Sequence, residues 1–273
     1  MQNFSISPNE MVNSFWKNKS LIRTLIKREI IGRYRGSLLG ILWSFFNPLL
    51  MLSIYTFVFG VIFKSRWRSN DTSQTEFALI LFAGLIIFNL FAECVNRSPS
   101  LILSNVNYVK KVVFPLEILP WVALGSGTFH ALISLVVWLI AYLILFGIPH
   151  LTVLFFPLVM LPLSLFIIGI TLFLASLGVY LRDVSQFVGI LVTMLMFLSP
   201  VFYPTTNLPE GVFRNLLAIN PLTAIIDEFR EVLFWGNLPD LTKISISFLT
   251  GIITAWLGFV WFQKTRKGFA DVI

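Results

Sequence analysis

The residues that could support catalysis are few in this sequence. It contains two histidines, His130 and His150, and one cysteine, Cys94. These are too few for a metal centre built from His and Cys, because zinc sites use about three or four protein ligands. The sequence also lacks the Gly-x-x-x-x-Gly-Lys-Ser/Thr pattern of a phosphate-binding loop. The residue chemistry therefore gives no support for an enzyme that binds ATP or a metal by these means.

His130 lies inside an apolar segment, and two interpretations of it stay open. An ionisable side chain within a membrane span is a candidate functional residue. The other interpretation is a neutral histidine that is hydrogen-bonded inside a helix bundle. We favour the second, because no carboxylate lies within a helical turn of His130 along the sequence. The predicted spans carry no Asp or Glu near their centres, where a proton-coupled carrier would need one.

Aromatic residues make up 15% of the chain, and 28 residues are Phe. Sugar rings present C–H faces that stack on aromatic rings, so a belt of such rings could guide a polymer without gripping one repeat. The ordinary interpretation is that Phe packs in cores and faces lipid, while Trp and Tyr gather at membrane interfaces. The candidates for a polymer-contacting surface, in two apolar segments, are Trp43, Phe46, Tyr55, Phe59, Phe197, Phe202 and Tyr203.

A charged segment over residues 107–120 carries two prolines, yet it is too apolar for a solvated loop. This composition predicts a segment that docks onto another surface. A linker that lies along the membrane surface is the alternative, and composition alone does not separate the two.

Apolar elements dominate the chain and must position these residues. The sequence is 57% hydrophobic and 12% charged, with a mean hydropathy of +0.85, whereas soluble domains carry about 25% charge. Crossing a bilayer as a helix takes about 20 mostly apolar residues, and segment 38–63 has that length without a charged side chain. We predict an all-α integral membrane protein with six transmembrane helices, at about 38–63, 77–92, 121–146, 151–181, 187–203 and 244–262.

The segment before the first span, residues 1–35, is predicted to be a cytoplasmic amphipathic helix that lies in the membrane interface, with the transmembrane domain over 36–273. Leu21, Leu25 and other apolar residues recur there at helical spacing, with basic residues mostly opposite. A plain positively charged anchor is the alternative. The excess of Lys and Arg before the first span and after the last predicts that both termini are cytoplasmic. The net charge of +7 is explained by this placement and needs no nucleic acid partner.

The connection between spans 5 and 6 is predicted to contain amphipathic or re-entrant helices. Asn220-Pro221 is a typical helix start, and Gly236 is a typical helix end. Before it, the run from Ser199 to Pro204 should break the fifth span near its outer end. Irregular backbone at that depth needs cover from protein or water, which indicates the mouth of a pathway.

Several short motifs occur in the order found in one known family. The resemblance covers about residue 10 to the end of the chain, and it depends on five motifs in register. These are Tyr-Arg-Gly-Ser-Leu-Leu-Gly (34–40) with Trp43 and Asn47-Pro48, Lys-Lys-Val-Val-Phe-Pro-Leu-Glu-Ile-Leu-Pro (110–120), Tyr-Leu-Arg-Asp-Val (180–184), Ser-Pro-Val-Phe-Tyr-Pro (199–204) and Asn220-Pro221. The sequence resembles the ABC-2 type permeases that export bacterial polysaccharides.

This resemblance implies a homodimer with six spans per protomer in the bacterial inner membrane. It implies two separate ATP-binding-cassette ATPase subunits, which bind ATP and Mg, so that this chain needs no cofactor of its own. The connection after the second span would carry the helix that couples to the ATPase, and aromatics of spans 1 and 5 would line the channel. The ATPase-coupling candidates are Asn107, Tyr108, Lys110, Lys111, Phe114 and Pro115.

The substrate implied by the resemblance is a glycan on an undecaprenyl carrier, most of all lipopolysaccharide O-antigen. Capsular polysaccharide and teichoic acid are the alternatives. Our hypothesis is that basic residues near the cytoplasmic entrance meet the carrier's pyrophosphate. The candidates are Lys27, Arg28, Arg33 and Arg35.

Two further functions remain open from the sequence. An exporter of the same architecture could move lipids or drugs, but a small apolar substrate would not need aromatic residues along the whole path. A membrane-bound glycosyl- or acyltransferase would need a carboxylate or histidine pair near one membrane face, and the sequence shows no convincing pair.

Overall fold

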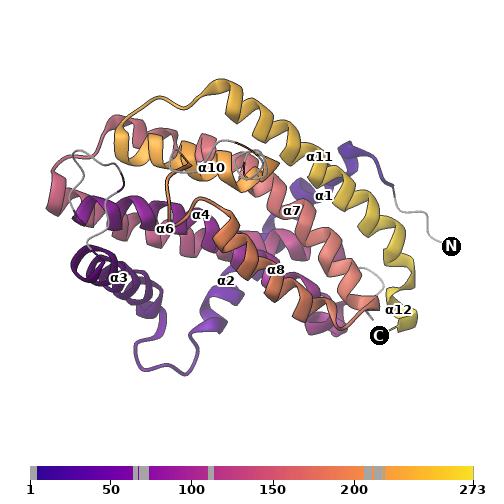
Figure 1. Ribbon diagram of the computed structural model, residues 1–273. Helices are drawn as coiled ribbons and strands as arrows, with labels where there is room; N and C mark the ends of the chain where they lie inside the picture. Colours follow the sequence, from indigo (N-terminus) through magenta and orange to yellow (C-terminus); the bar gives the residue numbers. More distant parts are fainter. Residues whose placement is uncertain are drawn as a thin grey trace.

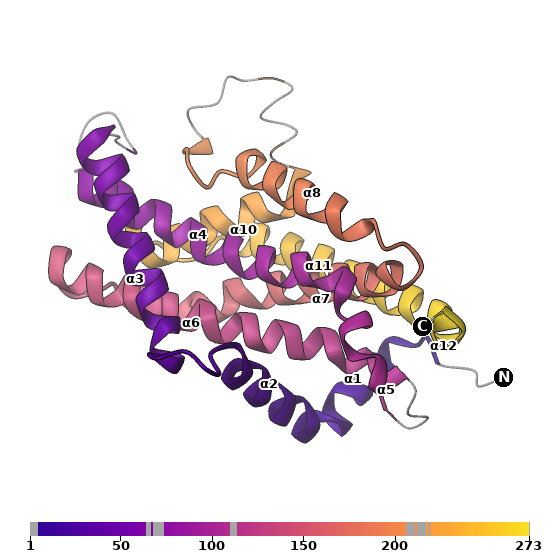
Figure 2. The ribbon, with the colours of Figure 1, turned by 90° about the horizontal axis from the view of Figure 1, so that it is seen from below.

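The computed structural model describes residues 5–63, 67, 74–109, 114–205, 211, 217 and 219–272, and these residues form helices and no strand. The long helices lie side by side in one bundle (Figures 1 and 2). This confirms the predicted all-α fold. The helices are α1 (Pro8–Lys17), α2 (Lys19–Arg33), α3 (Trp43–Tyr55), α4 (Gln74–Arg97), α5 (Val106–Val109), α6 (Leu119–Phe146), α7 (Phe156–Tyr180), α8 (Val184–Leu198), α10 (Pro221–Arg230), α11 (Leu241–Thr265) and α12 (Phe269–Val272).

Five of the predicted spans correspond to helical segments that are long and apolar enough to cross a membrane. They include short 3-10 or π turns that extend α3, α4, α6, α7 and α11. The chain is thus a multi-pass membrane protein by length and composition. The segments are Gly40–Ile62, Thr75–Ser100, Leu116–Phe146, Leu151–Tyr180 and Leu241–Val272.

The span predicted over 187–203 is shorter than expected. α8 has 15 residues, which is about 22 Å of helix against a hydrocarbon core of about 30 Å. It ends at Leu198 because Ser199 turns to an extended backbone, with ψ of 150°, ahead of Pro200. The predicted bound of the span at Tyr203 is therefore wrong, whereas the predicted break from Ser199 onward is confirmed.

α4 is the central helix of the bundle. In its most apolar stretch 83% of the residues are buried, against 11% for Gly40–Ile62, and it packs against α3, α6, α7, α8 and α10. It also continues past Ala92, the predicted end of the second span, to Arg97. Glu93 therefore lies within α4, one residue beyond the predicted end of the second span.

α7 and α11 form the closest helix pair, and glycines allow it. A Cβ atom on Gly169 would collide with the backbone of Thr254, and one on Gly258 would collide with the backbone of Gly169. In a membrane the hydrophobic effect does not drive helices together, and small residues at a crossing let two helix backbones pack closely. This pair fixes the last span against the middle of the chain.

The N-terminal segment forms two helices where the sequence predicts one. α1 begins at a cap in which Ser7 Oγ accepts a hydrogen bond from the backbone N–H of Glu10, and the helix ends at Asn18. Ile22 and Leu25 of α2 are buried against Ile118 and Val122. Part of the predicted lipid-facing side of this segment therefore packs on protein. Figure 2 shows α1, α5 and α12 at the same end of the bundle.

Candidate functional site

Four of the predicted aromatic residues lie in one continuous row. The ring centroids are 6.4 Å apart for Tyr55 and Phe59, 6.3 Å for Phe59 and Phe202, and 5.8 Å for Phe202 and Phe197. These spacings lie in the range for interacting aromatic pairs. We call Tyr55, Phe59, Phe202 and Phe197 the aromatic row. It joins the first span to the segment after α8.

The aromatic row is partly open among the described residues, and its buried side packs against the main hydrophobic core. Phe197 is 61% exposed, and Tyr55, Phe59 and Phe202 are half-buried. Tyr203 supports the row, since its hydroxyl donates a hydrogen bond to the backbone oxygen of Phe197 at 3.0 Å. Such a surface offers ring faces and edges but no charged group, so it can contact a polymer without fixing its register.

The other two aromatic candidates, Trp43 and Phe46, do not join this row. They lie at the other end of α3 and are 36% and 38% exposed. Phe46 contacts Phe45, with ring centroids 6.2 Å apart. A role for Trp43 and Phe46 along a polymer path stays a prediction.

The break after α8 positions Phe202, and Arg230 of α10 holds that break. Its Nη1 atom donates to the Pro200 backbone oxygen at 2.5 Å and its Nη2 atom to that of Val201 at 2.7 Å, while Nε donates to Ile80 at 3.0 Å. The guanidinium carbon lies 4.4 Å from the centre of the Trp67 ring. Arg230 thus donates to two backbone oxygens of the irregular segment after α8, which have no helical partner, and links that segment to α4 through Ile80.

α10 lies inside the bundle, which corrects its predicted polar side. In the amphipathic helix that the sequence predicts here, Glu228 and Arg230 would lie on the polar side, opposite the apolar residues. Both are instead buried, and α10 packs against α4, α7 and α11. Glu228 accepts from Lys243 Nζ at 2.9 Å and from the Asp240 backbone N–H at 2.8 Å. Burial inside the bundle contradicts a position on the protein surface, and the re-entrant form stays a prediction. Spacing along one helix could not reveal these partners, because they lie on other elements.

A polar pocket of about 230 Å³ lies between α2, α3, α4 and α6. The polar contacts in this pocket centre on Glu93. One carboxylate oxygen forms an ion pair with Arg33, and both oxygens lie 3.1 Å from His130 Nδ1. Tyr34 completes the group, with its hydroxyl 3.2 Å from His130 Nε2. Burial raises the pKa of Tyr34 above its ordinary value, so its hydroxyl is a neutral hydrogen-bonding group here.

This pocket contains the carboxylate that the sequence did not place near His130. Glu93 was missed because it lies on another helix and just past the predicted end of its span. His130 is therefore hydrogen-bonded inside the bundle, as favoured, but its partner is charged. A residue pair formed across two helices leaves no spacing signal in a single sequence.

Only one of the four basic candidates for a pyrophosphate, Arg33, lines this pocket. Arg28 instead donates to the Tyr108 hydroxyl at 2.6 Å. Lys27 and Arg35 are exposed. The structure therefore does not bring the four basic candidates together in one site.

The connection after α4 is built from short helical turns. They are Ser98–Ser100, Leu103–Asn105, α5 and Leu116–Ile118. Among the predicted coupling residues, Tyr108 and Phe114 stack with ring centroids 4.1 Å apart and planes at 6°. Asn107 is exposed and Pro115 is half-buried, whereas Lys110 and Lys111 lie outside the described residues.

Glu117 ties this connection to both terminal segments. It accepts from Ser14 Oγ of α1 at 3.0 Å and from Arg266 Nη1 after α11 at 2.5 Å. Arg266 Nη2 also donates to the Phe114 backbone oxygen at 3.0 Å. A displacement of the connection would therefore pull on the first and last helices together.

Within the part of the chain that the structure describes, no three His, Cys, Asp or Glu side chains are grouped so that they could hold a metal ion. The geometry thus gives a helical bundle with a partly open aromatic row and a polar pocket.

Comparison with known proteins identifies the family. The model of the family described as "ABC-2 type transporter" matches residues 20–234. An O-antigen export system permease protein RfbA of Myxococcus xanthus is 28% identical over 96% of this chain and 99% of its own length. One from Klebsiella pneumoniae is 29% identical over 93% of this chain and 95% of its own. The polysialic acid transport protein KpsM of Escherichia coli is 26% identical over 93% and 96%. The match covers most of the helices that build both the aromatic surface and the connection, and the chain belongs to the ABC-2 type transporter family.

Proposed function

We propose that this protein is the permease subunit of an ATP-driven exporter that moves a lipid-linked polysaccharide, most specifically O-antigen, across the bacterial inner membrane. Relatives named as O-antigen export permeases, aligned over nearly their whole length, support this substrate class. A capsule-type glycan is the second candidate, favoured by the similarity to a polysialic acid transport protein.

The observation that carries the proposal is the aromatic row on an open face. A glycan presents C–H ring faces at every repeat, so stacked side chains spaced along the path can hold it at any point. Because the row carries no charge, no single repeat is bound tightly enough to stop movement. The same reasoning disfavours a small drug or a single lipid as cargo, because neither would need aromatic side chains spaced along the path.

The energy is proposed to come from separate ATPase subunits that bind ATP and Mg. The exposed side chain of Asn107, together with Tyr108 and its neighbours, forms the docking segment in this proposal. Two copies of the chain would place two open faces around one pathway. Both termini would lie in the cytoplasm, at the end of the bundle where α1, α5 and α12 meet.

The pyrophosphate of the lipid carrier is proposed to meet the basic residues before the first span. Lys27 and Arg35 are exposed, so they can reach a membrane-borne phosphate directly. Arg33 already pairs with Glu93, which makes it a link between this region and the bundle.

The test replaces Tyr55 and Phe59 together by Ala. We expect surface glycan to fall severely in cells that contain only this variant, while the dimer and the ATPase still copurify with it. Phe57→Ala is the matched control, because Phe57 is 58% exposed on the same segment and makes no ring contact among the described aromatic pairs. Unchanged surface glycan in the double variant would remove the aromatic row from the mechanism.

A further inference from the structure

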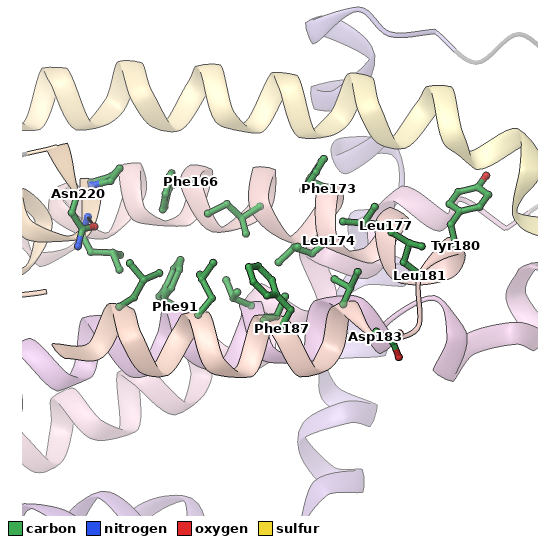
Figure 3. Close-up of a pocket in the computed structure, with 18 of the residues that line it drawn as sticks. Phe91, Phe166, Phe173, Leu174, Leu177, Tyr180, Leu181, Asp183, Phe187 and Asn220 are labelled. Atoms are coloured by element: carbon green, nitrogen blue, oxygen red, sulfur yellow. Dashed lines mark hydrogen bonds between the residues drawn. The ribbon is translucent and has the colours of Figure 1, made fainter. Parts of the chain in front are cut away.

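A long apolar groove runs between α7 and α8, and it is separate from the aromatic row. It encloses about 820 Å³, within the range of about 300–1,000 Å³ typical of ligand sites. Phe166, Phe173 and Leu177 of α7 form one wall, and Phe187 and Leu191 of α8 form the other. Figure 3 shows these side chains in two facing rows along the helices.

The groove has a floor, and it is closed at the end beside Asn220, which we call the closed end. Phe91 and Val95 of α4 form the floor and are buried. At the closed end, Asn220 Nδ2 donates to Ser199 Oγ at 2.9 Å and Oδ1 accepts from the Leu222 N–H at 3.0 Å. Both polar atoms of Asn220 thus have a partner within the protein, and Pro221 and Leu222 line the rest of this end, which suits the terminus of a hydrocarbon chain.

The other end of the groove opens beside two charged residues, Arg182 and Asp183. Both are exposed, and within the described residues neither side chain has an ion-pair or hydrogen-bond partner. By the charge pattern of the sequence, this short turn lies at the cytoplasmic membrane surface. The groove is thus apolar along its length, with opposite charges only at its mouth.

We propose that this groove binds one acyl chain of a glycerophospholipid whose headgroup carries a primary ammonium. The phosphate would lie at Arg182 and the ammonium at Asp183, so that both free charges gain a partner. From Val184 to Leu195 the wall of α8 is about 17 Å long, enough for most of an acyl chain. A carrier pyrophosphate fits less well, since its several negative charges would lie beside the Asp183 carboxylate.

The position of the chain is tested by photo-crosslinking of the full-length protein in bilayer nanodiscs. Phosphatidylethanolamine with a diazirine at the acyl terminus should label Phe166, Leu195 and Leu222, at the closed end. A diazirine near the glycerol should label Leu177 and Leu181, at the mouth. Equal labelling of the open faces of α3 and α8, or crosslinks that show a second copy of the chain in the groove, would overturn the proposal.

A groove-filling substitution tests whether this cavity retains the lipid. Leu191→Trp should lower phosphatidylethanolamine retained after detergent washing, measured by native mass spectrometry, to the level of random association. Ile190→Trp is the matched control, because Ile190 is exposed on α8 and does not line the groove. If Leu191→Trp does not fold, Leu191→Phe and the crosslinking of the unaltered protein still decide the question. Equal retention in the groove and control variants contradicts the proposal.

The headgroup is tested by competition. Phosphatidylethanolamine should be retained about two- to fivefold over phosphatidylglycerol, the range expected of an exposed ion pair. Asp183→Asn should remove that preference, and Arg182→Gln should weaken both lipids. Displacement of the phospholipid by undecaprenyl pyrophosphate at equal concentration would instead assign the groove to the lipid carrier and overturn this assignment.

Discussion

The Nη1 atom of Arg230 lies 2.5 Å from the backbone oxygen of Pro200, at the point where the fifth apolar helix has ended. Backbone groups inside a membrane protein need a partner, because lipid offers none. The single buried guanidinium satisfies carbonyl groups of Ile80, Pro200 and Val201. Arg230 therefore holds the backbone of the irregular segment that carries Phe202.

Arg230→Met should destabilise the protein by about 2 kcal/mol or more, because the Pro200 and Val201 carbonyl groups lose a donor and each costs about 1–3 kcal/mol. Arg230→Lys should recover only part of this loss, since an ammonium lacks the planar fork. Cys94 is the one cysteine and is buried, so its reaction with a thiol-reactive dye reports unfolding in detergent. Arg23→Met, at an exposed cation, is the control and should stay within about 0.5 kcal/mol. An Arg230→Met protein as stable as that control would contradict this role.

Gly258→Ala should destabilise the α7–α11 pair by about 1–3 kcal/mol, the usual cost of overpacking. The added methyl group would meet the backbone of Gly169, which has no flexible side chain that could move aside. Gly189→Ala provides the comparison, because a Cβ there meets nothing within 4 Å. That variant should be neutral or gain up to about 1 kcal/mol from helix propensity. Thermal unfolding of both variants measures the difference, and equal effects would mean that the close crossing is not what stabilises the pair.

The helical elements could be predicted from the sequence because bilayer thickness fixes how long an uncharged run must be. Segment 38–63 is an example, since its helical part, Gly40–Ile62, differs only at the ends. The run from Ser199 to Pro204 indicated where α8 ends, although the predicted span continued five residues too far, to 203. The residue that stabilises this break could not be predicted. The irregular backbone after the helix is stabilised by Arg230, which lies 30 residues beyond Pro200 in the chain.

The candidate site was likewise predictable only in part. Aromatic residues in two apolar segments could be recognised by type, and the structure brings Phe59 and Phe202 into contact. Their separation from Trp43 and Phe46 could not be predicted, because it depends on how α3 lies against the bundle. The contact of Glu93 with His130 could not be predicted either, since it depends on how α4 and α6 cross.

Glu93→Gln should destabilise the attachment of α2 more than Arg33→Gln does. Glu93 serves both Arg33 and His130, whereas Arg33 is half exposed, so water can replace its partner at a cost of about 1 kcal/mol or less. A double-mutant cycle between Glu93→Gln and His130→Gln should give a coupling of about 0.5–3 kcal/mol. Additive effects on unfolding would show that the contact contributes nothing to stability.

Tyr108→Ala should uncouple ATP hydrolysis from export if the connection after α4 is the docking segment proposed above. The substitution removes both the stack on Phe114 and the hydrogen bond from Arg28. Tyr108→Phe keeps the stack, worth about 0.5–1.5 kcal/mol beyond burial, and loses only an exposed hydrogen bond. We therefore expect near-normal export from the Phe variant and a strong loss from the Ala variant, with ATPase binding retained in both. Hydrogen exchange over 106–109 and 114–118 separates the causes: faster exchange in the Ala variant alone indicates that the stack orders the segment, whereas equal exchange with lost export assigns Tyr108 a direct contact with the ATPase.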